Sequence, residues 1–360
     1  MKRHGHGLVL GKFYPPHAGH HHLVRTARDR CERLTVLVCA ASVESIPLED
    51  RVAWMREVHP DADVVGAVDD IPVDLTDPAV WDAHMAVFRA AVPRRVDAVF
   101  TSEPYGTELA RRFRAEAVCV DPARTVFPVS GTAVRKDPVG CWDFLEPPVR
   151  AALARRIVVL GAESTGTTTL ARALARQLRA RGGIWSRTGC VPEYGREFSE
   201  QRLARLRAER PGATWSDVSF RTEDFPLIAR RQAALEDAAA RTGSPVLICD
   251  TDAFATTIWH ERYMGGPSVE VEEVAARGGR ADLWLLTDHR DVPFEDDGLR
   301  DGEHLRPWMT GRFAERLTAT GRRFLTLSGP HEQRLATALA AVDALLADGW
   351  RLADPLPERR

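Results

Sequence analysis

The feature of this sequence that most constrains its fold is an alternation of short apolar runs, rich in β-branched residues, with longer helical runs. Strands that alternate with helices of about 10–15 residues are typical of βαβ units, which place parallel strands in one sheet and helices on its faces. In the first half, the predicted strands are residues 8–13, 34–41, 63–68, 97–103 and 117–121. The predicted helices between them are residues 19–33, 48–59, 78–92 and 105–116. We therefore expect an α/β protein with a parallel sheet.

The alternation then starts again, which indicates a second parallel sheet. The predicted strands of the second half are residues 156–161, 246–250, 283–287 and 324–328. Its predicted helices are residues 167–181, 220–241, 307–320 and 332–348. A segment with two prolines, residues 144–155, joins the two series. Because a chain of 360 residues has room for two domains of roughly 100–200 residues, we predict one domain over residues 1–150 and another over 151–360.

Charge and apolar patterning exclude several classes of protein. The chain has 49 Lys and Arg residues against 51 Asp and Glu, and this formal net charge of −2 gives no global attraction to nucleic acid or to an anionic membrane. No apolar run approaches the ~18 residues that span a bilayer, and none near the start is long enough for a signal peptide. The six cysteines are scattered and include no Cys-x-x-Cys pair, so we expect reduced, buried thiols in a cytoplasmic protein.

The strongest local signal in the first half is the run GKFYPPHAGH, residues 11–20, between the first predicted strand and the first predicted helix. Ligands of parallel α/β sheets bind outside the carboxyl ends of the strands, and a helix N-terminus there favours phosphate. His17 and His20 are three residues apart, so in the first turn of a helix both rings would face the same ligand. Gly11 and Gly19 would let the backbone approach it closely. These groups suit the stabilisation of charge on a transferring phosphoryl group, although ordinary surface histidines would give the same spacing.

This run resembles the signature of the nucleotidyltransferase superfamily, which joins a nucleotide monophosphate to a phosphate- or acid-bearing acceptor. The superfamily carries a second motif, Ser-x-Thr-x-x-Arg at the start of a late helix, and Ser130, Thr132 and Arg135 are similar to it. Serine and threonine cap such a helix, and an arginine one turn further on is a phosphate clamp. The two motifs stand in the right order, about 110 residues apart. The resemblance implies that the first domain is a Rossmann-like nucleotidyltransferase domain.

The second half opens with a phosphate-binding loop pattern, Gly-x-x-x-x-Gly-Lys-[Ser/Thr], between a strand and a helix. Gly161, Gly166 and Thr168 match this pattern, but Thr167 stands where it has lysine. The backbone cradle of such a loop needs no lysine, and Thr168 is still suited to ligate Mg²⁺. What is lost is the cation that bridges the β- and γ-phosphates of ATP. The pattern therefore predicts a P-loop domain that binds nucleotide, and leaves open a degenerate domain that does not catalyse.

Two further features favour a kinase. A predicted strand ends in Asp250 and Asp252, which is the layout that holds Mg²⁺ at the carboxyl edge of a sheet. The run of residues 296–300 is typical of a lid that carries an arginine, although a charged surface loop has the same composition. Arg196 or Arg300 would supply the charge that Thr167 lacks, as a broad guanidinium fork rather than a point charge.

Taken together, the order and spacing of nine short segments resemble the bifunctional nicotinamide-mononucleotide adenylyltransferase/ribosylnicotinamide kinase family, the NadR type, over nearly the whole chain. The nine segments are residues 11–20, 51–54, 120–125, 130–135, 161–170, 193–197, 224–228, 250–252 and 297–300. Some members of this family begin with a helix-turn-helix repressor domain. Here the first strand is predicted by about residue 8, so we expect that domain to be absent and find no support for a DNA-binding role.

The resemblance implies two reactions of NAD biosynthesis. In the first domain, nicotinamide mononucleotide would take the adenylyl group of ATP, giving NAD and pyrophosphate, and in the second, ATP would phosphorylate nicotinamide riboside. The implied cofactor is Mg²⁺ with ATP, and the implied partners are these small molecules, with no nucleic acid and no membrane; a homo-oligomer is compatible with the sequence. The alternatives are a nucleotidyltransferase with another acceptor, such as pantetheine phosphate, and an enzyme whose degenerate P-loop domain senses ATP.

The candidate site residues follow from these motifs. The predicted catalytic residues are His17, His20, Arg135, Glu193, Asp250 and Asp252, of which the three acids are candidate bases for the kinase step. The residues predicted to bind ATP or its phosphates lie in or beside the two loops: Gly11, Lys12, Phe13, Gly19, Ser130, Thr132, Gly161, Ser164, Gly166, Thr167, Thr168, Thr169, Arg196 and Arg300. Thr168 and Asp250 are the predicted Mg²⁺ ligands.

Overall fold

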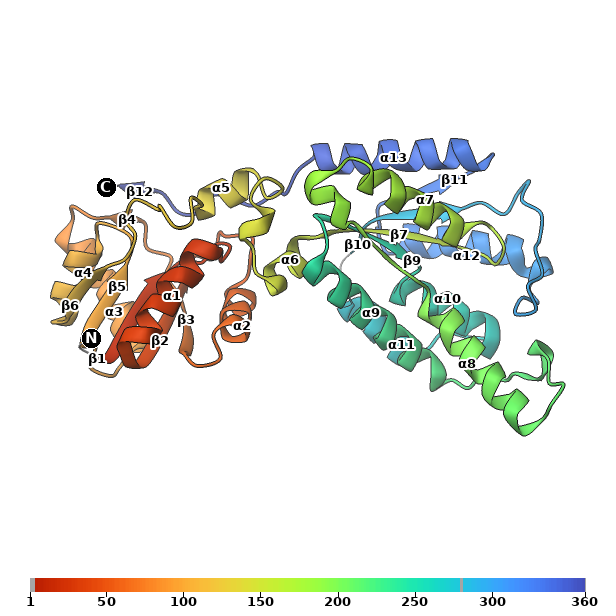
Figure 1. Cartoon of the computed structure of the whole chain (residues 1–360), viewed down its shortest axis with the longest axis horizontal. Coiled ribbons are helices and arrows are strands. Elements are labelled where there is room, and N and C mark those ends of the chain that lie inside the picture. Colours follow the sequence, from red (N-terminus) through yellow and green to blue (C-terminus); the bar gives the residue numbers. More distant parts are fainter. Residues whose placement is uncertain (1–3, 279–280, 360) are drawn as a thin grey trace. The chain divides into compact units, whose positions relative to one another are not determined.

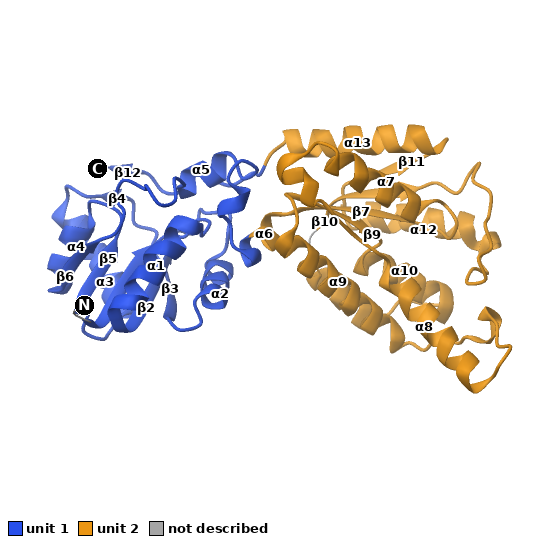
Figure 2. Ribbon diagram, viewed as in Figure 1, with its two compact units in different colours: residues 1–149, 350–360 blue, residues 150–349 orange. Residues whose placement is uncertain are grey.

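The computed structural model describes residues 4–278 and 281–359, and the chain divides into two compact units (Figures 1 and 2). Unit 1 comprises Met1–Val149 together with Trp350–Arg360, and unit 2 comprises Arg150–Gly349. The predicted second domain is therefore wrong at its end, because residues 350–359 pack with unit 1. They do so because the backbone of Glu358–Arg359 pairs with a short strand of that unit.

Unit 1 is built on a five-stranded sheet in the order β3-β2-β1-β5-β6, in which every neighbouring pair is parallel. Its strands are β1 (His4–Gly11), β2 (Cys31–Ala40), β3 (Asp63–Val68), β5 (Ala98–Thr101) and β6 (Glu116–Cys119). Its helices are α1 (Ala18–Arg30), α2 (Leu48–Val58), α3 (Pro78–Ala91), α4 (Gly106–Phe113) and α5 (Gly131–Lys136). The predicted parallel α/β class is confirmed, and β1 occupies the middle of the sheet.

Successive side chains of a strand point to opposite faces of the sheet, and in this sheet both sets are apolar, so helices cover both faces. In β1, Val9 packs into a core with Val24 of α1 and Met55 of α2, whereas Leu8 packs into a second core with Met85 of α3 and Leu109 of α4. All six side chains have 1% or less of their surface exposed, so each face is sealed by its own pair of helices. The carboxyl ends of the strands are left for the loops that form the site.

Unit 2 repeats this plan with a sheet in the order β11-β10-β7-β9-β8, again parallel throughout. Its strands are β7 (Arg155–Gly161), β8 (Gly189–Val191), β9 (Val246–Asp250), β10 (Ala281–Thr287) and β11 (Phe324–Leu327). Its helices are α7 (Thr167–Arg179), α8 (Tyr194–Glu209), α9 (Asp224–Thr242), α10 (Ala253–Met264), α11 (Val269–Arg277), α12 (Arg306–Ala319) and α13 (His331–Ala347). The short helix α6 (Pro147–Leu153) lies in the proline-containing segment that joins the units.

Three helices of unit 2 were not predicted. In α8, Leu203 is the one buried residue, so the helix has no apolar stripe whose period could be detected. In α10, eight residues are buried, so the helix is buried on more than one face and again lacks a clear period. In α11, Val271 alone is buried. The predicted lid is a loop: residues 288–302, between β10 and α12, contain neither helix nor strand.

Two smaller observations complete the fold. Cys31, Cys39 and Cys249 are buried as predicted, but Cys119 is exposed because it ends β6, an edge strand of its sheet. In the part of the chain that the structure describes, no helix is both long enough and apolar enough to cross a bilayer.

Candidate active sites

The first site is a cavity of about 320 Å³ at the carboxyl end of β1 in unit 1. The loops after β1, β3, β5 and β6 and the start of α5 line it. Every residue predicted for the first domain is part of this lining: Gly11, Lys12, Phe13, His17, Gly19, His20, Ser130, Thr132 and Arg135. The fold therefore brings the two sequence motifs to one place, as expected for the loops at this edge of a parallel sheet.

The two histidines lie against each other at the start of α1. His17 is the N-cap residue of the helix, and its ring stacks on that of His20 with 3.7 Å between the centroids. The Nδ1 atoms of both rings are buried and have no hydrogen-bond partner among the described residues. Burial, with the positive neighbour Arg124, lowers the pKa of His20 to about 3, and burial and His20 lower the pKa of His17 further. Both imidazoles are thus neutral and hold unused polar atoms in the cavity wall.

The second motif is joined to the first through Tyr14, which the sequence analysis did not identify. Ser130 caps α5 by accepting a hydrogen bond from the amide of Ala133 at 3.1 Å. Arg135 donates from Nη1 to the carbonyl of Tyr14 at 2.8 Å, and its guanidinium also lies 5.0 Å from the Tyr14 ring. A side chain at Gly131 would bring its Cβ within 3.0 Å of that same carbonyl, so the glycine allows the close approach of the two segments.

A buried ion pair also contacts the Tyr14 ring. Arg51 is fully buried, lies 4.4 Å from the ring centroid, and pairs with Glu44 at 2.6 Å. It also donates to the carbonyl of Lys12 at 3.1 Å. The segment 51–54, which carried part of the family resemblance, therefore holds the histidine-containing loop in place rather than contacting the cavity itself.

One flank of the first cavity is aromatic and acidic, and the motifs did not reveal it. Asp69, just after β3, accepts a hydrogen bond from Nδ1 of His84 at 2.7 Å, and the side chains of both are less than 10% exposed. Trp81 and Phe88, on the same helix as His84, line the cavity beside them. The sequence predicted only a helix over residues 78–92, and apolar periodicity does not distinguish a helix face in a core from one in a pocket wall.

The second site lies at the carboxyl end of β7 in unit 2, around a cavity of about 130 Å³. The predicted residues that line it are Gly161, Ser164, Thr167, Thr168, Glu193, Arg196, Asp250 and Arg300. Gly166 lies at the N-cap of α7 with a φ of +84°, which a glycine adopts without strain, and Thr169 lies inside the first turn of α7. Neither of these two residues lines the cavity.

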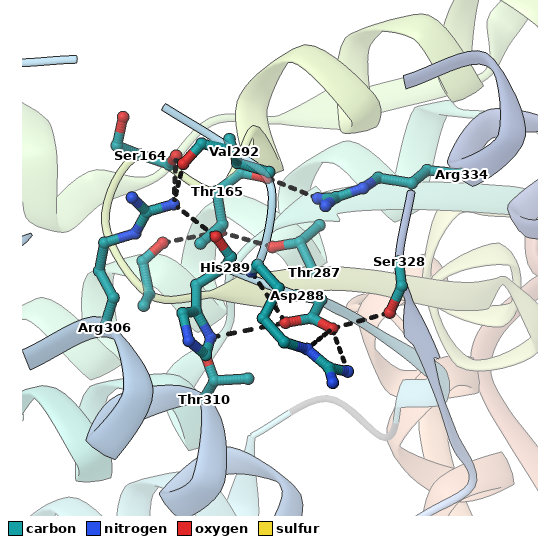
Figure 3. Close-up of polar contacts among 12 residues, drawn as sticks. Ser164, Thr165, Thr287, Asp288, His289, Val292, Arg306, Thr310, Ser328 and Arg334 are labelled. Carbon is teal, nitrogen blue, oxygen red and sulfur yellow. Dashed lines mark hydrogen bonds and ion pairs between the residues drawn. The ribbon is translucent and has the colours of Figure 1, made fainter. Parts of the chain in front are cut away.

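The P-loop is fixed from behind by a polar network (Figure 3). The hydroxyl of Thr165 lies 2.6 Å from that of Thr287 at the end of β10. Arg334 donates to the Thr165 carbonyl at 3.0 Å, and Arg306 donates to the carbonyls of His289 and Val292 at 3.0 and 2.9 Å, with the Ser164 carbonyl at 3.4 Å (Figure 3). Two guanidinium groups thus contact carbonyls of the P-loop, and Arg306 also binds carbonyls of the loop that follows β10.

Both arginines proposed to replace the P-loop lysine reach the cavity, and they are bound to one carboxylate. Arg196 donates to Asp297 at 2.7 Å, and Arg300 lies 3.5 Å from the same side chain. Arg300 also donates to the carbonyl of Glu295 at 2.7 Å and approaches the Ser164 hydroxyl at 3.4 Å. The loop that carries Asp297 and Arg300 is therefore already attached to α8 and to the P-loop.

The acids of the second site differ in what they contact. Asp250 is 4% exposed; burial raises its pKa, while hydrogen bonds from the Thr168 and Thr167 hydroxyls and the charge of Arg172 oppose the rise. Arg172 was not among the predicted residues, although it stands one turn after Thr168 on α7. Burial and the neighbouring Asp250 raise the pKa of Glu193 to about 8.

The prediction that Asp252 is catalytic does not agree with its position. This residue does not line the cavity. Its carboxylate caps α10 by accepting from the amide of Ala255 at 2.8 Å, and it accepts from the indole of Trp284 at 2.9 Å. The turn between the two acids explains the difference, because Thr251 has a φ of +72° and directs Asp250 and Asp252 to different sides.

A group of aromatic side chains forms another part of the lining of the second cavity. They come from the loop before α9 and from α9 and α10, and they are Trp215, Phe220, Phe225, Trp259 and Tyr263. The Phe220 and Tyr263 rings are 4.7 Å apart, and Trp259 stacks on Tyr263 at 6.3 Å. We refer to these five residues as the aromatic cage. The i, i+4 pair on α10 was the only sequence signal for it, and that spacing is equally typical of a core helix.

Comparisons with known proteins assign the same two halves. A family described as cytidylyltransferase-like matches residues 8–137, and one described as an AAA domain matches residues 156–334. The chain is 26% identical over 314 residues to the trifunctional NAD biosynthesis/regulator protein NadR of Escherichia coli K12, covering 82% of this chain and 71% of that one. The NadR protein of Salmonella typhimurium is 25% identical over the same shares.

Solved structures show the same fold over the whole chain. A crystal structure of a NadR protein in complex with NR superposes with a TM-score of 0.72 at 20% identity, covering 98% of this chain and 99% of that one. A crystal structure of a NadR protein with NAD and AMP-PNP gives a TM-score of 0.68 at 19% identity, with 96% and 97% covered.

Proposed function

Since this chain is a homologue of the NadR proteins, we propose that it makes NAD by two ATP-dependent reactions, one in each unit. Unit 1 would transfer the adenylyl group of ATP to nicotinamide mononucleotide, and unit 2 would phosphorylate nicotinamide riboside to that mononucleotide. The observation that carries this proposal is that His17, His20, Ser130 and Arg135 line one cavity although they come from two distant segments. The NadR structures with NR, NAD and AMP-PNP support the same classes of ligand.

The first reaction needs no base. A phosphate oxygen of the mononucleotide is already an anion; it bonds to the α-phosphorus of ATP while the bond from that phosphorus to the bridging oxygen breaks and pyrophosphate leaves. Catalysis is then positioning and stabilisation of charge. The neutral rings of His17 and His20 would donate N–H hydrogen bonds to the ATP phosphates, whose negative charge favours protonation of the rings. Lys12 and Arg135 would hold the departing pyrophosphate.

The second reaction starts from a neutral hydroxyl, so a carboxylate that accepts its proton contributes to the rate. The hydroxyl oxygen bonds to the γ-phosphorus of ATP, its proton goes to the carboxylate, and ADP leaves. Glu193 suits this role because its pKa of about 8 makes it a stronger base than an ordinary carboxylate. Asp250 is held by the hydroxyls of Thr167 and Thr168 on the P-loop side, which suits the phosphate end of the site.

The residues around Asp250 also fit Mg²⁺. Among the described residues, no group of three or more His, Cys, Asp or Glu side chains has the arrangement of a protein-only metal site. A buried carboxylate beside the Thr168 hydroxyl instead offers the one or two protein oxygens that Mg²⁺ takes when phosphates and water complete its shell. Asp250 and Thr168 would hold the ion, which when bound would neutralise charge on the β- and γ-phosphates.

The aromatic cage supports a cationic ring as the acceptor of unit 2. The pyridinium of nicotinamide riboside carries a positive charge, and aromatic faces attract such cations. The cage lines the same cavity as Glu193 and Asp250, so the ring and the acceptor hydroxyl would be bound together.

A second candidate function for unit 2 rests on Thr167. This residue replaces the lysine of the P-loop and donates a hydrogen bond to Asp250, so the loop has no cation of its own beside the β- and γ-phosphates. In that case unit 2 would bind ATP without transferring phosphate and would act as a sensor of nucleotide. Arg196 and Arg300, which line the cavity, favour the kinase.

One purified preparation tests both proposals. It is supplied with Mg-ATP and, separately, with nicotinamide mononucleotide, nicotinamide riboside and pantetheine phosphate, and NAD, mononucleotide, pyrophosphate and ADP are quantified. We expect NAD and pyrophosphate from the first acceptor. The second should give ADP and mononucleotide, part of which unit 1 converts to NAD and pyrophosphate, and the third should give no product. Product from pantetheine phosphate alone would overturn the assignment of unit 1. ATP binding without mononucleotide, restored to turnover by Thr167→Lys, would identify unit 2 as a sensor.

A further inference from the structure

The last described residues of the chain lie in unit 1, although they follow α13 of unit 2 (Figure 2). We call residues 350–359 the C-terminal segment. Its strand β12 (Glu358–Arg359) pairs in parallel with β4 (Val73–Asp74). The amide of Val73 donates to the carbonyl of Pro357 at 3.2 Å, and that of Leu75 donates to the carbonyl of Arg359 at 3.0 Å. The segment therefore continues the loop that follows β3.

The other end of the C-terminal segment is bound to the histidine-containing loop. The Tyr14 hydroxyl donates to the carbonyl of Ala353 at 2.8 Å and accepts from the amide of Ser45 at 2.9 Å. The amide of Ala353 in turn donates to the Ser45 hydroxyl at 2.7 Å. Tyr14 is only 2% exposed, and Arg51 and Arg135 lie against its ring. The segment therefore binds Tyr14, the residue that joins the histidine-containing loop to Arg135 of the second motif.

Between these two attachments, the segment enters the lining of the first cavity. Pro355 and Glu358 are both part of that lining. The segment pairs with β4, which follows β3, and β3 is the edge strand on one side of the central strand β1. Arg124 follows β6, the edge strand on the other side. The segment thus lies on the flank that carries Asp69, Trp81 and His84.

The burial of the segment argues against a role in stability alone. A segment that only stabilised unit 1 would bury apolar side chains in its core. None of residues 350–359 is buried, and the attachments are hydrogen bonds to residues that line or support the cavity. The segment is held at the site without being part of either core.

We propose that residues 353–358 form a wall of the first site and bind the pyridinium end of the acceptor mononucleotide, an inference that rests on the proposed adenylyl transfer. The flank it completes carries the carboxylates of Asp69, Asp74 and Glu358 beside the Trp81 and His84 rings. Carboxylates and aromatic faces both attract a cationic ring. The phosphate end of the acceptor lies toward His17 and His20, and Glu358 is a positioning residue for the opposite end.

The test compares the intact chain with three variants. Glu358→Gln removes one charge from the wall, Asp354→Asn removes one charge from the same segment at a residue outside the cavity lining, and a stop codon after Gly349 removes the whole segment. We expect the truncation to raise KM for nicotinamide mononucleotide about tenfold and Glu358→Gln about threefold, with kcat and KM for ATP changed less than about twofold. Asp354→Asn and the kinase reaction of all variants should match the intact chain.

The other possible results of this experiment each support or overturn the proposed wall. An unchanged KM for the mononucleotide in the truncated chain, or a rise in KM for ATP instead, overturns the proposal. If the truncated chain loses both activities through misfolding, the pair Glu358→Gln and Asp354→Asn decides, and equal KM values for the two overturn it. If the intact chain makes no NAD, the adenylyl transfer fails; the wall is then tested by amide hydrogen exchange at Val73 and Leu75. Slower exchange with nicotinamide mononucleotide present supports the wall, and unchanged exchange overturns it.

Discussion

The loops that open the two candidate sites of this protein occupy equivalent places but offer different groups to a ligand. Each follows the middle strand of a five-stranded parallel sheet, β1 or β7, and leads into a helix. The loop of unit 1 presents the rings of His17 and His20, whereas the backbone of the loop in unit 2 is contacted at its carbonyls by Arg306 and Arg334. Because the backbone of such a loop binds phosphate without a lysine, threonine at position 167 is compatible with the nucleotide site that we propose for unit 2.

The largest expected effect concerns the base in the P-loop unit. Glu193→Gln should lower kinase kcat by about 10³-fold, because the amide cannot accept the proton of the attacking hydroxyl. In the intact enzyme, kcat/KM should rise with pH as Glu193 loses its proton, with an apparent pKa near the value of about 8 for the free enzyme. Steady-state kinetics between about pH 5.5 and 9 measure this rise. If kcat/KM stays constant over this range, Glu193 is not the base, and Asp250 is the next candidate.

The matching change in unit 1 is His20→Ala, which should lower the rate of adenylyl transfer by about 10²-fold or more by removing a contact to the reacting phosphates. Kinase activity should remain, since His20 belongs to the other unit. Both rates are measured on one preparation. Equal loss of the two activities would show that the ring has a structural role.

Arg196 and Arg300 test whether phosphoryl transfer in unit 2 also depends on charged side chains. Arg300→Ala should lower kinase kcat by about 10- to 100-fold, and Arg196→Ala by less, since both guanidinium groups share Asp297 but only Arg300 approaches the P-loop. The control is Arg290→Ala, which removes a guanidinium from the same connection but outside the cavity. If Arg300→Ala matches the intact enzyme, the missing charge comes from elsewhere, and Arg172 is the next candidate.

The smallest expected effect is on stability, and it compares how tightly the glycines of the two sites are packed. Gly161→Ala should reduce the free energy of unfolding of unit 2 by about 1–3 kcal/mol, because the added methyl group would overlap the hydroxyls of Thr287 and Thr165. Gly131→Ala in unit 1 should cost less, since its Cβ would stop 3.0 Å from the Tyr14 carbonyl. Denaturant unfolding of both variants measures the difference. Equal costs would show that the two loops are packed with similar tolerance.

Sequence patterns predicted those parts of the molecule in which local and tertiary preferences agree. The strands buried on both faces and the amphipathic helices were found. The short motifs also named nine residues that the structure brings together in the lining of the first cavity. Helix α8 was missed because Leu203 is its one buried residue, so the helix shows no apolar period. The aromatic cage and the Asp69–His84 pair were missed because a pocket wall has the same apolar spacing as a core.

Two errors had more specific causes. Asp252 was taken as catalytic because it stands two residues from Asp250, but the left-handed conformation of Thr251 separates them, and sequence spacing carries no information about such a turn. The C-terminal segment was assigned to the wrong unit because it joins unit 1 through backbone hydrogen bonds, which leave no signature in the side chains.

The position of the C-terminal segment has a consequence for synthesis of the protein. Domains fold as units while the chain leaves the ribosome, at ~5–20 residues per second. The sheet of unit 1 is complete once β6 has emerged, but the segment that lines its cavity is translated only after all of unit 2, roughly 200 residues and about 10–40 s later. The candidate site of unit 1 is therefore completed last, although most of its residues are translated first. Each nascent chain completes this site only after unit 2 has been synthesised.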